Sequence, residues 1–331
     1  MMRLRSSERG QRGAALIIVL LLVATLAFIL LSITDRVTAS VQRSAADRAR
    51  AELLWRGAAA QEVARRMLAK AAEAGAFDKV APNSGLLSQE FELPFGTGTA
   101  ALRFQDASRC FNLNALVSAP ADDSGAESTV TEADRLAQLG VARGLGDSEA
   151  RNFASVVADF LDKDAAERIQ GAEDGFYSAL PVPYRTAGGD IASVSEIRAM
   201  DGVSRDLYRR VKPLLCTIAG AEQPSVNLNF LDAQDAPLIF AMTNGEWSLG
   251  EIRDQIEKRP PGGWNEVNDF WAPYVEKGGA APSSPGSLTS SRIEALVRLE
   301  VNGRTMEEKL LFEVKSGAEP KLVAHTFGDD Y

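Results

Sequence analysis

The chain has 331 residues, a formal net charge of −9 at pH 7, and aromatic side chains at 7% of its positions. This length exceeds what one compact core usually holds, so we expect two or more lobes. The acidic balance argues against nucleic acid or an anionic membrane surface as the main partner. His325 is the single histidine, which argues against a zinc site or a histidine-based catalytic triad.

The N-terminus combines a basic segment with a long apolar run. Residues 14–34 carry no charge and follow a segment that contains Arg3, Arg5, Arg9 and Arg12. The run matches the ~20 residues that a helix needs to cross a bilayer. The basic flank favours a cytoplasmic N-terminus with the rest of the chain outside. A secretory signal peptide would have a shorter apolar run followed by small residues at a cleavage site.

The junction between Arg12, Gly13 and Ala14 is more specific. It resembles a prepilin signal, in which a dedicated peptidase cuts after the glycine on the cytoplasmic side. This resemblance implies that Ala14 becomes the N-methylated first residue of a mature protein that keeps its apolar helix. A plain signal anchor is the alternative. Pilins and most pseudopilins carry a glutamate five residues after the cut, where this chain has Ile18. An apolar residue there removes a charge that is costly at membrane depth.

The apolar run should continue as one long helix. Residues 35–75 contain no proline and one interior glycine, Gly57. An imperfect apolar stripe predicts the face that packs on a head, and it consists of Val37, Val41, Leu53, Leu54, Val63, Met67 and Leu68. A rod on the order of 90 Å, half in lipid and half on a head, is typical of pilin subunits. A signal anchor followed by a coiled-coil stalk is the alternative.

Both ends of the ectodomain show the period of two that is typical of strands. Apolar side chains alternate over residues 91–95, and a turn at 96–98 leads into 100–105, which predicts a hairpin. A second hairpin is predicted over 292–314, because Asn302 and Gly303 suit a type I′ turn. The sequence between them is helical in character. We therefore predict a small sheet with a helical insertion at roughly 117–285.

The insertion contains a short internal sequence repeat. Residues 111–116 (FNLNAL) resemble 226–231 (VNLNFL), and the later segments 191–197 and 264–270 also correspond. In each later segment, Ser or Asn precedes a helix whose first turn carries Glu, which is typical of a capped N-terminus. We interpret the insertion as two degenerate copies of one helical module.

At this point the chain resembles the K-type minor pseudopilins of type II secretion systems (GspK family). The resemblance rests on the leader, on Ile18 and on segments 110–116, 158–164, 171–177, 194–203 and 208–215. It implies an α+β protein with a pilin-like antiparallel sheet and an inserted all-helical domain of two SAM-like, helix-hairpin modules. The expected divisions are a leader (1–13), the N-terminal helix (14–76), the N-terminal half of the pilin-like β domain (77–116), a first helical module (117–218), a second helical module (219–285) and the C-terminal half of the β domain (286–331).

A group of carboxylates forms the candidate metal site. Asp159 and Asp162 are three residues apart and so share one face of a helix that ends near Lys163. From the residues alone, a Ca²⁺ site and a solvated acidic helix end both remain open, and an EF-hand is excluded because its loop glycine is missing. The resemblance implies calcium in this domain. The candidate ligands are Asp159, Asp162, Asp164, Glu173 and Asp174.

Two further features carry weaker signals. Cys110 and Cys216 can form a disulfide outside the cytoplasm, or they can be two buried thiols. Residues 193–211 look like a helix-hairpin-helix with nearby basic side chains, a shape that often binds DNA. Asp201 in the hairpin and the location outside the cytoplasm argue against nucleic acid, and packing is the simpler role.

These observations predict a structural protein without catalytic residues. The resemblance implies a tip subunit of the type II secretion pseudopilus, which initiates and caps the filament with the I and J minor pseudopilins. Further expected partners are the other pseudopilins, the prepilin peptidase and the inner membrane, with the C-terminal domain in the periplasm. The alternative is a membrane-anchored periplasmic enzyme or receptor whose helical lobe binds a ligand.

Overall fold

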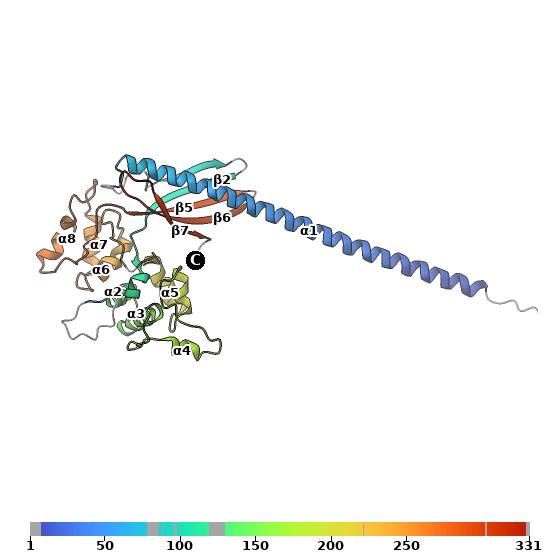
Figure 1. The fold of residues 1–331 in the computed structure, drawn as a ribbon, viewed down its shortest axis with the longest axis horizontal. Helices are drawn as coiled ribbons and strands as arrows, with labels where there is room; N and C mark the ends of the chain where they lie inside the picture. The colour runs from blue at the N-terminus through green and yellow to red at the C-terminus, as the bar shows by residue number, and fades with distance from the viewer. Residues whose placement is uncertain are drawn as a thin grey trace, which may run out of the picture.

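A computed structural model of the chain describes residues 8–77, 86–87, 89–95, 98–118, 130–220, 222–301 and 303–328. Its dominant element is α1 (Glu8–Glu73), a single helix of 66 residues. At ~1.5 Å per residue this helix is about 100 Å long. Its first half projects away from the rest of the molecule (Figure 1). Large apolar side chains in that half are exposed, including Leu16, Phe28 and Ile33. The predicted long N-terminal helix is confirmed.

The second half of α1 packs on a β-sheet through small side chains. The residues that face the sheet are almost fully buried and recur every four positions at Ala60, Ala64, Leu68 and Ala72. Alanines at this spacing let the helix lie close to the strands. The apolar stripe predicted from the sequence was wrong at three positions that are exposed, Val37, Val41 and Leu54. None of these three side chains belongs to the hydrophobic core that α1 forms with the sheet.

The sheet has five strands in the order β1-β2-β5-β6-β7, and every neighbouring pair is antiparallel. The strands are β1 (Glu90–Phe95), β2 (Gly98–Asp106), β5 (Arg292–Val301), β6 (Arg304–Glu313) and β7 (Lys321–Phe327). In β5 every second side chain is buried, as the alternation predicted. Both predicted hairpins are present, whereas β7 was missed because almost all of its side chains are exposed and no apolar alternation marks it. Since β2 pairs with β5, the two ends of the ectodomain form one sheet.

The segment between β2 and β5 is the predicted insertion, and it contains most of the helices. They are α2 (Glu132–Ala142), α3 (Asp147–Leu161), α4 (Asp174–Ser178), α5 (Arg205–Val211), α6 (Ala236–Met242), α7 (Leu249–Glu257) and α8 (Val267–Glu276). The insertion has two hydrophobic cores, one built around α2 and α3 and one around α7 and α8. Helix α6 joins them, because Leu238 packs in the first core and Ile239 in the second.

A disulfide closes the first helical module. Cys110 and Cys216 are bonded, with their Cα atoms 5.7 Å apart, so the structure selects one of the two alternatives left open by the sequence. Beside this bond, β3 (Phe111–Asn112) pairs in parallel with β4 (Leu215–Cys216). The insertion is therefore not purely helical. The disulfide and the short strand pair hold together two points of the chain that are 106 residues apart.

The sequence repeat corresponds to a repeated hydrogen-bond arrangement. In the first module, the side chain of Asn114 accepts from the backbone N–H of Ile191 (2.9 Å) and donates to its carbonyl (3.1 Å). In the second, Asn229 makes the same two bonds with Trp264 (2.7 and 3.5 Å). A capping box follows two residues later in each case, at Ser193 and at Glu266. Two copies of one local structure thus occur in the two modules.

Candidate metal site

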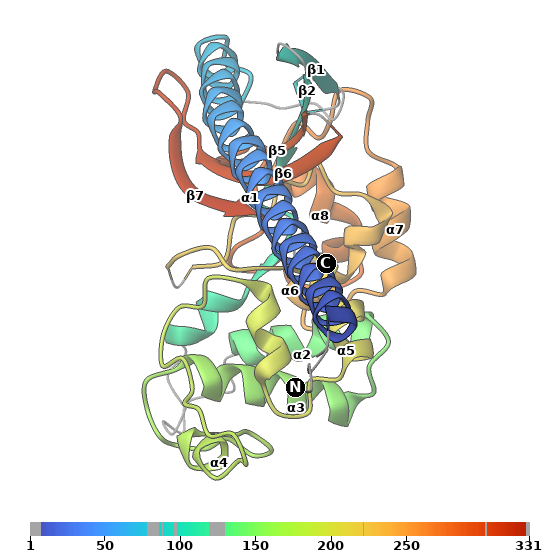
Figure 2. The ribbon, with the colours of Figure 1, turned by 90° about the vertical axis from the view of Figure 1, so that its right-hand side faces the viewer.

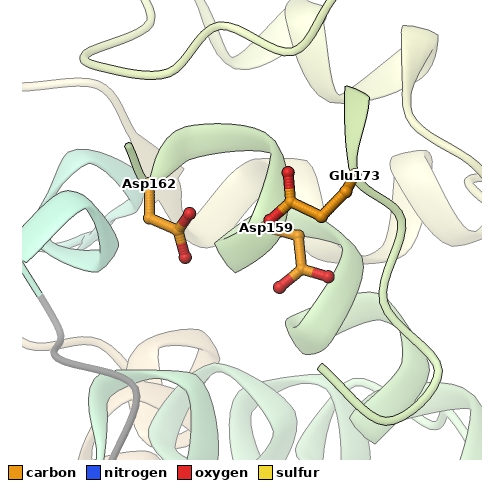
Figure 3. A group of neighbouring side chains, drawn as sticks. All are labelled: Asp159, Asp162 and Glu173. Carbon is orange, nitrogen blue, oxygen red and sulfur yellow. The ribbon is translucent and has the colours of Figure 1, made fainter. Parts of the chain in front are cut away.

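Three of the predicted carboxylates converge at the end of α3 (Figure 3). Asp159 lies in the last turn of the helix, Asp162 is its C-cap residue, and Glu173 precedes α4. Their candidate ligand oxygens all lie within 4.8 Å of one another. The side chains are buried, with 0%, 4% and 8% exposure respectively. Spacing along α3 aligns the two aspartates, and the chain must then return to bring Glu173 to them.

Gly171 permits that return. A Cβ atom at this position would lie 1.8 Å from Oδ2 of Asp159, so any larger residue would push the loop away from the helix. Gln170, next to it, has a positive φ of 66°. The tight passage of the loop over Asp159 is what places Glu173 in the cluster.

Arg168 from the same loop is the cationic partner of the cluster. Its Nη1 atom lies 2.6 Å from Asp159 Oδ1 and 2.5 Å from Asp162 Oδ2. The backbone N–H of Arg168 also donates to Asp159 Oδ2 at 3.1 Å. Two oxygens of the cluster remain without a hydrogen-bond partner, Asp162 Oδ1 and Glu173 Oε1. Buried polar atoms are nearly always satisfied, so these two oxygens offer acceptor capacity that no described residue uses.

The charges of the cluster are strongly coupled. Burial, together with the neighbouring Asp159 and Asp162, raises the pKa of Glu173 to about 7. Burial also raises the pKa of Asp162, although Arg168 acts in the opposite direction. Burial alone would lower the pKa of Arg168, but its ion pairs with Asp162 and Asp159 raise it. Three buried acids with one guanidinium leave negative charge that a divalent cation would neutralise.

The other two candidate ligands have different partners. Asp164 is exposed and accepts a hydrogen bond from the N–H of Ala166 at 2.8 Å, which closes a local turn. Asp174 accepts from the N–H and the hydroxyl of Thr186, both at 2.8 Å. These bonds lower the pKa of Asp174. The structure thus brings together three of the five predicted residues, and neither Asp164 nor Asp174 belongs to the cluster. The sequence analysis missed Arg168, because nothing in its spacing links it to Asp159.

The predicted membrane segment and processing site both lie in α1. Within the described residues, Leu16–Glu73 is the one helix long and apolar enough to span a bilayer, and the most apolar window of 18 residues has a mean hydropathy of 3.2. None of that window is buried inside the molecule. The backbones of Gly13 and Ala14 continue the same helix, and Ile18 is 62% exposed. An exposed apolar surface of this length needs a lipid or protein environment.

The predicted helix-hairpin-helix is a short 3-10 helix, η2 (Val194–Ala199), followed by α5. Gly202 in the connecting turn has a φ of +68°. Arg210 on α5 forms an ion pair with Asp206 at 2.7 Å and donates to the carbonyl of Gly144 at 2.9 Å. This basic side chain is therefore used within the fold.

Comparison with known proteins gives concordant matches. Family models described as "Type II secretion system (T2SS), protein K" match residues 109–220 and 226–282. The chain is 31% identical over 259 residues to the type II secretion system protein K of Pectobacterium carotovorum subsp. carotovorum, covering 77% of both chains. It is 28% identical over 325 residues to that of Klebsiella pneumoniae, covering 96% of this chain and 97% of the relative.

A solved structure has the same fold. It is a chain of the GspK-GspI-GspJ complex from the enterotoxigenic Escherichia coli type 2 secretion system, with a TM-score of 0.73 at 23% identity. The match covers 87% of this chain and 100% of the solved chain. From the two family models and the relative that is 31% identical, we conclude that the chain belongs to the type II secretion system protein K family.

Proposed function

We propose that this chain is a minor pseudopilin that forms the tip of a type II secretion pseudopilus together with the I and J minor pseudopilins. The observation that carries the proposal is family membership combined with the projecting apolar helix α1. The solved chain of the same fold belongs to a complex with GspI and GspJ, which supports the same partners for this chain. The role is structural, and the protein would serve export across the outer membrane by starting a filament.

The shape of the head supports a position at the start of the fibre. Helix α8 lies at the side of the head that is farthest from the projecting half of α1, below the end of α1 that packs on the sheet (Figure 1). A view from the other end of α1 shows the first helical module, α2 to α5, spread to one side of the helix (Figure 2). Such a bulky insertion would obstruct a subunit stacked above. Ile18 offers no carboxylate to pair with the amine of an earlier subunit, which fits a subunit that has none before it.

Processing and location follow from the N-terminus. The prepilin peptidase would cut after Gly13, and Ala14 would become the methylated first residue. Before assembly, α1 would hold the protein in the inner membrane as a single-pass anchor, with the head in the periplasm. The other pseudopilins would then join below the tip complex.

We also propose that the cluster of Asp159, Asp162 and Glu173 binds Ca²⁺. These residues suit the ion, because Ca²⁺ takes six to eight oxygen ligands and two buried carboxylate oxygens here have no partner. The ion would link the end of α3 to the segment before α4. Its role would be to stabilise the helical lobe.

An enzyme or receptor receives no comparable support. A cavity of about 650 Å³ lies beside the disulfide, between the sheet and the first module. Its lining mixes basic and acidic side chains, among them Arg103, Lys212 and Glu294. His325 is not among the residues of this lining and instead pairs with Glu308 at 3.2 Å. No described arrangement of a nucleophile and a base favours catalysis.

The position in the fibre can be tested by labelling. The full chain, tagged at its C-terminus, would be produced with the other pseudopilins of its own system, and pseudopili would be imaged by immunogold electron microscopy. We expect one label at one end of each fibre. The purified chain should also form a complex with the I and J minor pseudopilins at equal stoichiometry, and the major pseudopilin serves as the control. Labels at regular intervals along the fibre would refute the proposal.

A further inference from the structure

We propose that Arg168 is a built-in counter-cation of the acidic cluster that Ca²⁺ must displace, so that metal binding releases the loop that carries Arg168. This inference rests on the proposed calcium role of the same residues. It adds a competitor within the chain, and hence a coupling between the metal and the conformation of residues 163–169, while Gly171 keeps its place beside Asp159.

The guanidinium of Arg168 lies between the two aspartates of the cluster. Nη1 of Arg168 lies 2.6 Å from an oxygen of Asp159 and 2.5 Å from an oxygen of Asp162. Oxygen ligands surround Ca²⁺ at about 2.3–2.6 Å, so the guanidinium nitrogen occupies a point where the ion would lie. Two cations cannot share that point. The side chain of Arg168 is 19% exposed, which leaves a route for it to leave toward solvent.

Arg168 also occupies carboxylate oxygens that a metal would need as ligands. Arg168 uses both oxygens of Asp159, one through its backbone N–H and one through its guanidinium, and it also uses Oδ2 of Asp162. Only Asp162 Oδ1 and the carboxylate of Glu173 then remain for a metal, too few for the six to eight ligands of Ca²⁺. Departure of the guanidinium would free one more oxygen on each aspartate. The two oxygens left without a partner are nine-tenths buried and lie in the cluster itself.

The loop that carries Arg168 is exposed to solvent on both sides of this residue. Residues 163–167 are exposed, and Ile169, directly after the arginine, is 92% exposed. In the described part of the structure, the guanidinium of Arg168 is held by hydrogen bonds to Asp159 and Asp162. When the metal takes over both carboxylates, this side chain loses the bonds that hold it against α3. The bond between Arg168 and Ile169 should then become accessible.

Calcium titration of the full chain in detergent tests the competition. Isothermal titration calorimetry with CaCl₂ would compare the wild type with Arg168→Met, which keeps an apolar stem without the charge. We expect the variant to bind calcium about tenfold more tightly, equal to about 1.4 kcal/mol. The matched control is Arg185→Met, because Arg185 is 84% exposed and only 3.8 Å from Asp174, outside the cluster. This control should bind as the wild type does.

Tryptic cleavage of the unmodified chain gives a second measurement that does not depend on a variant folding. Trypsin must take the arginine side chain into its own pocket, so metal-free protein should resist cleavage after Arg168. Calcium should increase cleavage there relative to cleavage after Arg185, a ratio that cancels any effect of calcium on trypsin. The inference about Arg168 would be overturned if Arg168→Met bound calcium no more tightly than the wild type, or if calcium left the cleavage ratio unchanged. Either result would leave the calcium proposal standing. Absence of calcium binding in all three proteins would overturn both this inference and the calcium proposal.

Discussion

Gly57 of α1 lies directly against Glu308 of β6. A Cβ atom on Gly57 would be 2.0 Å from Oε1 of Glu308, a distance that no real contact allows. Glu308 is 2% exposed and pairs with His325 of β7 at 3.2 Å. A helix glycine therefore makes room for a buried carboxylate where α1 crosses the sheet. This contact joins α1 to β6, an inner strand of the sheet.

We expect Gly57→Ala to destabilise the head by about 1–3 kcal/mol, because an added methyl group in a packed contact forces side chains or backbone to shift. Urea unfolding of the detergent-solubilised chain, monitored in the head, would measure it. The control is Gly250→Ala in α7, where an added Cβ meets nothing within 4 Å. That exposed helix position should gain up to about 1 kcal/mol. Equal effects of the two substitutions would show that packing against Glu308 is unimportant.

Glu308 should also make stability depend on pH. Burial raises the pKa of Glu308 above its ordinary value of 4.5, although the adjacent His325 acts in the opposite direction. Because the pKa of Glu308 is raised in the folded state, its contribution to the free energy of unfolding is fully present below pH 4.5. This contribution is lost as the pH rises through the raised pKa. Each unit of pKa difference corresponds to about 1.4 kcal/mol.

Glu308→Gln removes this titration and keeps the shape of the side chain. We expect the wild type to lose stability relative to Glu308→Gln as the pH rises above 4.5. Thermal melts of both proteins at a series of pH values above 4.5 would give the difference, in which the titrations of groups that do not contact Glu308 cancel. A difference that stays constant with pH would contradict the expectation.

Removal of calcium should lower the melting temperature of the head. A ligand that binds only the folded state stabilises it by about 2.7 kcal/mol at a hundredfold excess over its dissociation constant. The combined change Asp162→Asn with Glu173→Gln should abolish the difference between calcium and chelator in a differential scanning calorimetry melt. Asp164→Asn and Asp174→Asn are the matched controls, because both carboxylates lie outside the cluster and accept hydrogen bonds elsewhere. A wild-type melt that is identical in chelator would reject the metal site.

Cleavage of the leader should depend on Gly13. Gly13→Leu should leave the leader attached, because the prepilin peptidase that we expect to process this chain would cut directly after Gly13. Mass spectrometry of the N-terminus from cells with active prepilin peptidase would detect Ala14 with an added methyl group in the wild type alone. Gly10→Leu is the control, since Gly10 lies away from the junction and cleavage should persist. An intact wild-type leader, or a cut after Thr34, would refute the prediction.

The sequence by itself determined the features that depend on local chemistry. The uncharged run at 14–34 predicted a helix that is long and apolar enough to cross a bilayer, and the structure contains that helix. The Asn302-Gly303 turn signal and the alternation of β5 predicted the C-terminal hairpin, since both are properties of neighbouring residues. The spacing of Asp159 and Asp162 placed both on one helix face. The repeat at Asn114 and Asn229 was visible because each copy must repeat the same side-chain hydrogen bonds.

Tertiary structure alone decided the contacts between distant segments. Strand β7 is exposed on nearly all of its length, and its strand conformation comes from pairing with β6. The buried face of α1 includes Gly57, which contacts Glu308, 251 positions later in the chain. The positions of apolar residues along α1 therefore did not identify this face correctly. Arg168 joined the cluster through a loop that folds back over Gly171, while Asp164 and Asp174 turned to other partners. Residue spacing along α3 carries no information about which side chains of the returning loop enter the cluster, because the path of that loop is set by its contacts with the helix.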